Sequence, residues 1–140
     1  MNSTTTRHDL GMLALRLTTG AVFVAHGAQK LFVYGFGGVS GAFGGMNIPA
    51  PTITGPLTAL VEFFGGLALV FGLLTRLTGL GLGITMLGAI AFVHIANGFF
   101  APNGVEYPLA LLGANVALMC IGAGRFSLDA LIASRRGRVS

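Results

Sequence analysis

Two apolar runs separated by a Thr-Arg pair decide the fold: PLTALVEFFGGLALVFGLL at residues 56–74 and LTGLGLGITMLGAIAFVHIAN at residues 77–97. A membrane helix needs about 20 mostly apolar residues, and both runs are close to that length. The first run holds one charged residue, Glu62, and the second holds none. We therefore predict two membrane-spanning helices joined by a tight turn at Arg76.

The same criterion identifies two further spans, at residues 10–34 and 107–124. Composition agrees with this reading: 54% of the 140 residues are apolar and only 9% are Asp, Glu, Lys or Arg, against about 25% in an ordinary soluble domain. Helix ends read from sequence are uncertain by about two to four residues. The composition argues against a water-soluble fold and predicts one all-α membrane domain, a bundle of four transmembrane helices.

Basic residues near the ends of the spans predict the orientation, because Lys and Arg are retained on the cytoplasmic side of a membrane. The connections at residues 35–55 and 98–106 contain no Lys or Arg. The opposite side carries Arg7, Arg76, Arg125, Arg135, Arg136 and Arg138. We expect both termini in the cytoplasm of a bacterial-type cell, with the chain in the cytoplasmic (inner) membrane. The net charge of +4 is then expected to meet anionic lipid rather than nucleic acid.

Two segments outside the spans also carry apolar residues. Residues 127–136 predict a short amphipathic helix with Ser127 as its N-cap, Asp129 in its first turn and Leu128, Leu131 and Ile132 on its apolar face. We expect this helix to lie along the membrane surface. The connection at residues 35–55 is rich in glycine yet holds several apolar side chains. It is expected to fold back, without regular helix, over the outer mouth of the bundle or to lie in the shallow interface.

A set of polar side chains lies within the predicted spans, where ionisable groups are costly and usually face the bundle interior. Counting along each helix places five of them in the outer half of the membrane: His26, Lys30, Glu62, His94 and Asn115. Lys30 and Glu62 lie at similar depths on neighbouring spans, so we predict that they form an ion pair. Glu106 and Tyr107, at the start of the last span, are expected to border the same mouth.

Several interpretations of this polar cluster are open. Lys30 and Glu62 could simply fix the register of two helices, with His26 as a core histidine. Alternatively, the cluster could exchange protons or bind a quinone headgroup, since histidine and a partly desolvated carboxylate are suitable acids and bases. A haem between His26 and His94 fits poorly, because the two depths differ by about 7 Å. No metal site is expected.

The remaining reactive or charged residues receive simpler interpretations. Arg16 is expected to extend its side chain toward the cytoplasmic surface, and Arg76, Arg125, Arg135 and Arg136 to mark the topology and contact lipid headgroups. Cys120 is the single cysteine, so the chain cannot form an internal disulfide. We expect this thiol to be buried among apolar neighbours.

Seven segments together resemble one family of small membrane proteins. They are residues 15–17 (LRL), 23–31 (FVAHGAQKL), 45–49 (GMNIP), 62–76 (EFFGGLALVFGLLTR), 94–100 (HIANGFF), 104–107 (GVEY) and 122–129 (GAGRFSLD). The chain resembles the DoxX family of four-span membrane proteins over nearly its whole length. The resemblance implies an integral membrane protein associated with oxidoreductases, similar to the membrane subunits of thiosulfate:quinone oxidoreductase.

Three classes of function follow from these observations. The first is a quinone-linked subunit of an oxidoreductase assembly, which would need partner proteins because the chain has no flavin, haem or iron–sulfur motif. The second is a scaffold that holds soluble redox enzymes through its basic cytoplasmic rim. The third is a small proton or acid transporter. Small residues at helical spacing also allow a homo-oligomer.

Overall fold

The computed structural model describes residues 3–137, and every regular element in that range is helical. The elements in chain order are α1 (Ser3–Ala28), the π-helical segment η1 (Gln29–Tyr34), α2 (Gly35–Gly45), α3 (Pro51–Phe71), α4 (Thr75–Ala89), the π-helical segment η2 (Ile90–His94), the 3-10 helix η3 (Ile95–Asn97), α5 (Glu106–Ile121) and α6 (Leu128–Arg136). The predicted all-α class is confirmed. Arg138, one of the predicted surface arginines, lies outside the described residues.

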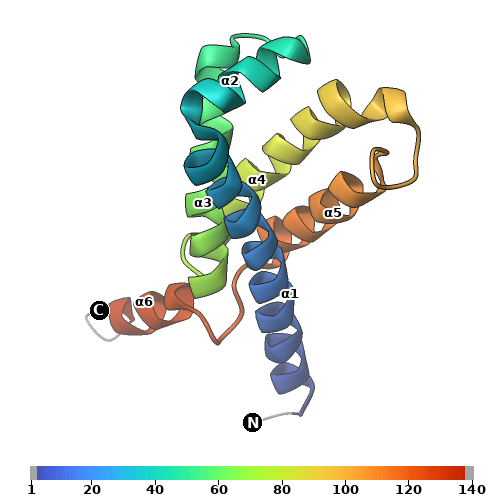
Figure 1. Ribbon diagram of the computed structural model, residues 1–140. Coiled ribbons are helices and arrows are strands. Elements are labelled where there is room, and N and C mark those ends of the chain that lie inside the picture. Colours follow the sequence, from blue (N-terminus) through green and yellow to red (C-terminus); the bar gives the residue numbers. More distant parts are fainter. Residues whose placement is uncertain (1–2, 138–140) are drawn as a thin grey trace.

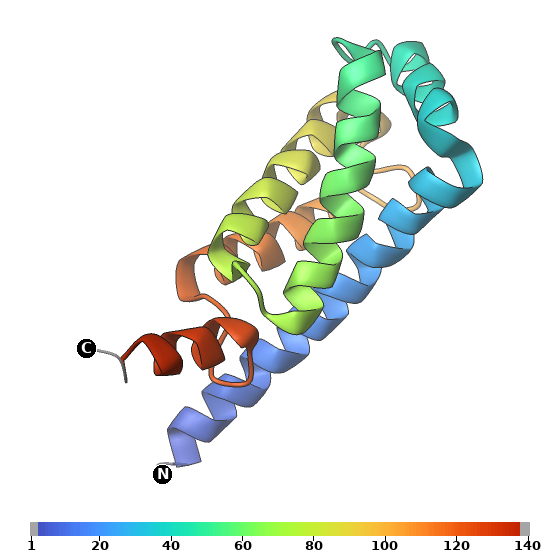
Figure 2. The same ribbon diagram turned by 90° about the vertical axis from the view of Figure 1, so that its left-hand side faces the viewer.

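The long helices run side by side as two pairs (Figure 1). α1 lies along α3, α4 lies along α5, and α3 also contacts α4. The start of α1 and the short α6 lie at one end of the bundle, whereas α2 and the connection at residues 98–105 lie at the other (Figures 1 and 2). We refer to these as the α6 end and the α2 end.

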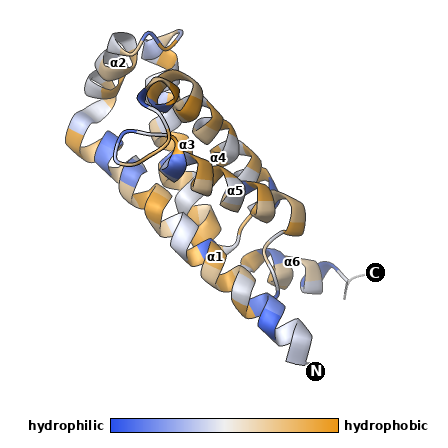
Figure 3. Cartoon of the chain, turned by 90° about the vertical axis from the view of Figure 1, so that its right-hand side faces the viewer, coloured by the Kyte–Doolittle hydropathy of each residue, from blue (hydrophilic) through white to orange (hydrophobic). Residues whose placement is uncertain are grey.

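The bundle has the length and hydropathy of a membrane protein. Within residues 3–137, three helical stretches are long and apolar enough to cross a membrane: Ser3–Gly45, Pro51–Phe71 and Thr75–Asn97. α5 is apolar but has 16 residues, a rise of about 24 Å against a hydrocarbon core of about 30 Å. Figure 3 shows hydrophobic colour along the long helices and hydrophilic colour toward the two ends. A complete fourth crossing by α5 stays a prediction.

Small residues bring the helices of each pair into close contact. A Cβ atom added at Gly66 of α3 would lie 2.6 Å from the backbone nitrogen of Val24 in α1. One added at Gly79 of α4 would lie 2.9 Å from the backbone oxygen of Asn115 in α5. Both distances are shorter than real Cβ contacts, so only glycine permits these approaches. Such contacts replace the hydrophobic driving force that helices lack inside a lipid bilayer.

The connection at residues 35–55 is more ordered than predicted. The chain bends at Gly35, where φ is 67°, and then forms the helix α2, which packs against α3. Val39 of α2 is buried, and Gly55 of α3 lies against the backbone of Ser40. α3 begins at Pro51 rather than at the predicted residue 56, because proline is well suited to the first turn of a helix. The expectation of an irregular segment was therefore wrong.

The sequence led us to expect Arg16 at the lipid surface. The structure instead buries it, with 1% of its surface exposed. Its Nε donates to the Leu69 carbonyl at 2.8 Å, Nη1 to that of Ala123 at 2.6 Å and Nη2 to that of Phe126 at 2.8 Å. Leu69 lies in the last turn of α3, and its carbonyl also accepts the backbone N–H of the C-cap residue Gly72 at 3.1 Å. The linker between α5 and α6 supplies the other two. Arg16 thus joins α1, α3 and the linker after α5. The pattern of α1 alone does not predict these contacts.

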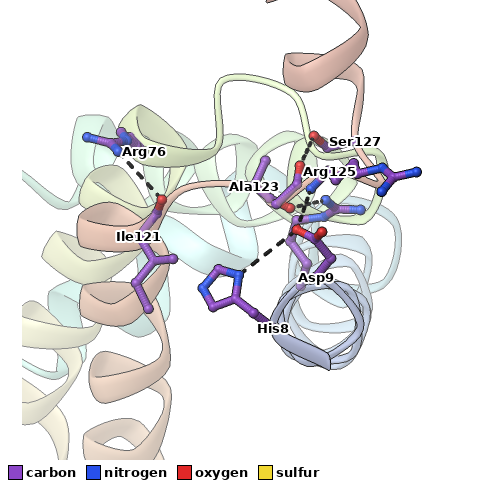
Figure 4. Close-up of polar contacts among 9 residues, drawn as sticks. His8, Asp9, Arg76, Ile121, Ala123, Arg125 and Ser127 are labelled. Atoms are coloured by element: carbon purple, nitrogen blue, oxygen red, sulfur yellow. Dashed lines mark hydrogen bonds and ion pairs between the residues drawn. The ribbon is translucent and has the colours of Figure 1, made fainter. Parts of the chain in front are cut away.

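The linker after α5 makes further polar contacts at the α6 end (Figure 4). The buried carboxylate of Asp9 accepts the backbone N–H of Arg125 at 3.0 Å and lies 3.9 Å from Nδ1 of His8. Arg76 is exposed and reaches the Ile121 carbonyl at 3.5 Å. The start of α1 and the end of α5 are therefore held together through backbone groups of the linker.

The predicted C-terminal helix is present as α6, and Ser127 caps it by accepting the N–H of Ala130 at 3.1 Å. Asp129 has a role the sequence did not predict. Its carboxylate accepts the backbone N–H groups of Leu74 at 2.7 Å and Thr75 at 2.9 Å, at the start of α4. Leu74 has no side-chain oxygen to cap α4 itself. α6 therefore supplies the missing cap and is held against the turn between α3 and α4.

Cys120 is exposed on α5, so the expectation of a buried thiol was wrong. Leu118 and Asn115 are the buried residues of the same helix segment. Successive residues of a helix are rotated by about 100°, which puts Cys120 about 200° away from Leu118. Cys120 thus lies on the face of α5 that points away from the bundle core.

Candidate functional site

A cavity of about 130 Å³ lies near the α2 end, between α1, α3, α4 and α5. Four of the five predicted polar residues line it: His26, Lys30, Glu62 and His94. The remaining wall residues are Phe23, Met86, Ala89, Tyr107, Pro108 and Leu111. Polar groups from four helical elements, α1, η1, α3 and η2, therefore share one largely apolar cavity.

The ion pair predicted between neighbouring spans is formed. Lys30 Nζ lies 2.5 Å from Glu62 Oε2. The Glu62 side chain is 6% exposed and that of Lys30 is 20% exposed, so the carboxylate is the more deeply buried partner. Glu62 is the one carboxylate among the residues that line the cavity. A buried carboxylate needs such a partner, because an unpaired charge in an apolar setting is strongly unfavourable.

Both helices that carry the cationic or imidazole groups of the cavity change geometry there. Lys30 lies in the π-helical segment η1 and His94 closes the π-helical segment η2. A π-turn adds one residue to the helical turn and so rotates the following side chains relative to an α-helix, and π-turns are frequent at functional sites. The sequence predicts continuous α-helix through both stretches and carries no signal for a π-turn.

His94 is oriented by the connection at residues 98–105. Its Nδ1 lies 2.7 Å from the backbone oxygen of Asn103. A carbonyl oxygen can only accept a hydrogen bond, so Nδ1 must carry the proton. In the neutral ring, Nε2 then holds the free lone pair and can accept a proton. The same connection is held from its other side by Glu106, whose Oε1 accepts the N–H of Ala101 at 2.6 Å.

His26 and Tyr107 form the side of the cavity between α1 and α5. Their ring centroids are 6.2 Å apart, with an interplanar angle of 41°. Both residues are exposed, Tyr107 by 46%, and both line the cavity. The exposed side of this wall therefore faces away from the helix core, between α1 and α5. Tyr107 borders the cavity as predicted, whereas Glu106 turns toward the connection.

Asn115 does not line this cavity, which corrects the prediction from depth alone. It lies on α5 one helical turn beyond the wall residue Leu111, is fully buried and donates to the Leu111 carbonyl at 2.9 Å. Its Oδ1 has no hydrogen-bond partner. Gly79 and Gly83 of α4 lie directly against Asn115. The close approach of α4 and α5 at these glycines leaves no space beside the amide.

The cavity limits what can bind. Drug-sized ligands occupy about 300 to 1,000 Å³, so a haem between His26 and His94 does not fit here. Among residues 3–137, no three His, Cys, Asp or Glu side chains are grouped so as to hold a metal ion. The predicted surface arginines lie elsewhere: Arg76, Arg125, Arg135 and Arg136 are exposed in or beside the turns and helix of the α6 end.

Several known proteins resemble this chain over most of its length, and two of them are named as membrane proteins. "Putative oxidoreductase CatD" of Bacillus subtilis (strain 168) is 31% identical, over 94% of this chain and 96% of that protein. "Inner membrane protein YqjF" of Escherichia coli (strain K12) is 34% identical over 89% of this chain and 93% of that protein. "Uncharacterized membrane protein Rv3486" of Mycobacterium tuberculosis is 33% identical over 89% of this chain and 82% of that protein. No solved structure matches significantly.

The family comparison agrees with these relatives and with the motifs of the sequence. The DoxX family model matches residues 11–95, which include most of α1, all of α2, α3 and α4, and the cavity residues up to His94. The matched region also contains the pair Lys30–Glu62 and the buried Arg16. The chain therefore belongs to the DoxX family of membrane proteins.

Proposed function

We propose that this protein is the membrane subunit of a quinone-linked oxidoreductase assembly and that the cavity at the α2 end takes the quinone ring. The observation that supports this most is the composition of the cavity: an ion pair, a histidine with a free lone pair, and the rings of His26 and Tyr107 in a wall whose other residues are apolar. The oxidoreductase name of the Bacillus subtilis relative points in the same direction.

Size and access suit a single ring from the lipid phase. A cavity of about 150 Å³ is known to hold benzene, and this one measures about 130 Å³. The wall formed by His26 and Tyr107 is exposed between α1 and α5. A quinone diffusing in the bilayer would enter sideways there, with its tail left among the lipids. No route through water is needed.

The residues of the cavity supply the hydrogen bonds and proton transfer that such a ring requires. A bound quinone would supply the exchange of two electrons and two protons. Lys30 would donate a hydrogen bond to one ring oxygen, while Glu62 holds its ammonium in place. His94 Nε2 would accept a proton from a hydroxyl of the reduced quinone or return it. The Asn103 carbonyl holds the His94 imidazole in position for that transfer. Electrons would come from a partner protein.

We further propose that the α6 end faces the cytoplasm and meets those partners. Exposed arginines gather in its turns and helix: Arg76, Arg125, Arg135 and Arg136. This observation also favours a scaffold role as the second candidate, in which the protein anchors soluble redox enzymes without binding quinone. Salt-sensitive co-purification of a soluble enzyme together with a quinone-free cavity would support the scaffold.

The quinone content of purified protein tests the first proposal. Protein is extracted from membranes in mild detergent, and the bound quinone is quantified after extraction with organic solvent. We expect near-stoichiometric quinone in the wild type and in the control His8→Ala, because His8 lies outside the cavity. His94→Ala should lose the quinone while keeping its helical circular dichroism, since His94 is not part of the ion pair.

Two results would count against quinone binding. The first is a wild type without quinone whose melting temperature also fails to rise with an added short-tailed quinone. The second is a folded His94→Ala variant that retains as much quinone as the wild type. Glu62→Gln distinguishes a purely structural ion pair from one that takes part in quinone binding. A purely structural pair predicts lower thermal stability, with quinone lost only as the protein unfolds.

A further inference from the structure

The α6 end contains a second hollow, of about 480 Å³, between the start of α4, the end of α5 and the start of α6. It lies at the opposite end of the bundle from the quinone cavity. We propose that this hollow binds the phosphate headgroup of an anionic phospholipid, with the acyl chains lying along its apolar rim. The residues that carry this proposal are Leu74, Thr75, Arg76, Leu77, Ile121 and Asp129.

Arg76 is the cation available to the phosphate. Its side chain is exposed, and its one contact is a long one, 3.5 Å from Nη2 to the Ile121 carbonyl (Figure 4). Within residues 3–137, no carboxylate lies within ion-pairing distance of Arg76. An arginine fork can donate two parallel hydrogen bonds to a phosphate, which makes it a preferred phosphate ligand.

Thr75 provides a second and independent polar group. The residue is 1% exposed, lines the hollow, and its Oγ1 has no hydrogen-bond partner. A buried hydroxyl without a partner is unfavourable by about 1 to 3 kcal/mol. A headgroup oxygen in the hollow would satisfy this hydroxyl.

The carboxylate of Asp129 does not cancel the charge of Arg76. Both of its oxygens accept backbone N–H groups, from Leu74 and Thr75. It also interacts electrostatically with the buried guanidinium of Arg16. The two oxygens of Asp129 are thus engaged by protein donors, and its charge is partly balanced by Arg16, which leaves the guanidinium of Arg76 available to an anion.

The apolar rim favours a lipid over a free phosphate ion. Leu74, Leu77 and Ile121 line the hollow and are between 47% and 64% exposed. They lie where membrane-type helices end, beside a helix whose own apolar residues are exposed. A soluble anion would leave this apolar surface uncovered, whereas the first methylene groups of two acyl chains would cover it.

The test compares lipids and matched variants of the full chain in detergent. Native mass spectrometry measures the binding of phosphatidylglycerol and of phosphatidylcholine. The variants are Arg76→Gln, Thr75→Val and the control Arg136→Gln, which removes the same charge from α6 outside the hollow. We expect phosphatidylglycerol affinity to fall about tenfold in Arg76→Gln, since a charge-assisted hydrogen bond is lost, and to stay within about twofold in Arg136→Gln.

Thr75→Val keeps the test informative if Arg76→Gln fails to fold. Valine has nearly the shape of threonine, so the lipid-free variant should melt at or above the wild-type temperature, because an unpaired hydroxyl has been removed. Its gain in melting temperature on adding phosphatidylglycerol should be smaller than that of the wild type. Equal losses in Arg76→Gln and Arg136→Gln, equal affinity for the two lipids, or displacement of the lipid by millimolar inorganic phosphate would each overturn the proposal.

Discussion

Replacement of Arg16 by lysine tests how the α6 end is held together. Lysine keeps the positive charge and a long stem but lacks the planar fork of the guanidinium. In the structure, three nitrogens of Arg16 donate to three carbonyls, of Leu69, Ala123 and Phe126. A single ammonium cannot reach all three of these carbonyls, one on α3 and two on the linker, at once. We expect it to keep about one of these hydrogen bonds.

The loss can be worked out from these contacts. A hydrogen bond to a charged group contributes about 1.5 to 3 kcal/mol, so two lost bonds at the lower value give about 3 kcal/mol. The free energy of unfolding in mixed micelles, followed by circular dichroism against added denaturing detergent, measures this directly. Arg76→Lys is the matched control, because Arg76 is exposed and makes one contact at 3.5 Å. Its change should stay below about 0.5 kcal/mol.

A second readout identifies the segment that loosens. If Arg16 holds the linker between α5 and α6, limited proteolysis should cut Arg16→Lys between Gly122 and Ser127 faster than the wild type or Arg76→Lys. The reasoning fails if Arg16→Lys unfolds with the same free energy as Arg76→Lys and is cut no faster. That outcome would mean that the three carbonyls are satisfied equally well by lysine and water.

Two more predictions concern packing and orientation. Gly66→Val should prevent folding of the α1–α3 pair, since its Cβ would lie 2.6 Å from a backbone nitrogen. The control Gly113→Ala has open space around the added Cβ. Its free energy of unfolding should equal that of the wild type or exceed it by up to about 1 kcal/mol. Equal melting temperatures for the two variants would refute the packing argument. In a Cys120→Ser background, Ser40→Cys should react with an impermeant maleimide added outside intact cells, and Ser134→Cys should not. The reverse labelling would refute the proposed topology.

The sequence predicted the features of the candidate site that depend on position along one helix. Depth along each span, counted at 1.5 Å per residue, placed His26, Lys30, Glu62 and His94 in the outer half of the membrane, and all four line the cavity. Opposite charges at one depth were sufficient to predict the Lys30–Glu62 pair, because an unpaired charge there is unfavourable. Asn115 shows the limit of this argument. Its position along the helix was counted correctly, but the close approach of α4 at Gly79 leaves no space beside it.

On its own, the sequence established the kind of protein. Long apolar stretches bounded by glycine, proline and charged residues form helices of membrane type. Hydropathy is a local property, so this conclusion needs no knowledge of which segments are neighbours in space. The tertiary structure alone decided which groups meet. Asp129 caps a helix that starts 54 residues earlier, and Arg16 binds carbonyls up to 110 residues away. The turn of His94 toward Asn103 likewise follows a local π-helical segment. Such partners depend on helix rotation and on the path of the linkers, which the hydropathy of a single segment does not encode.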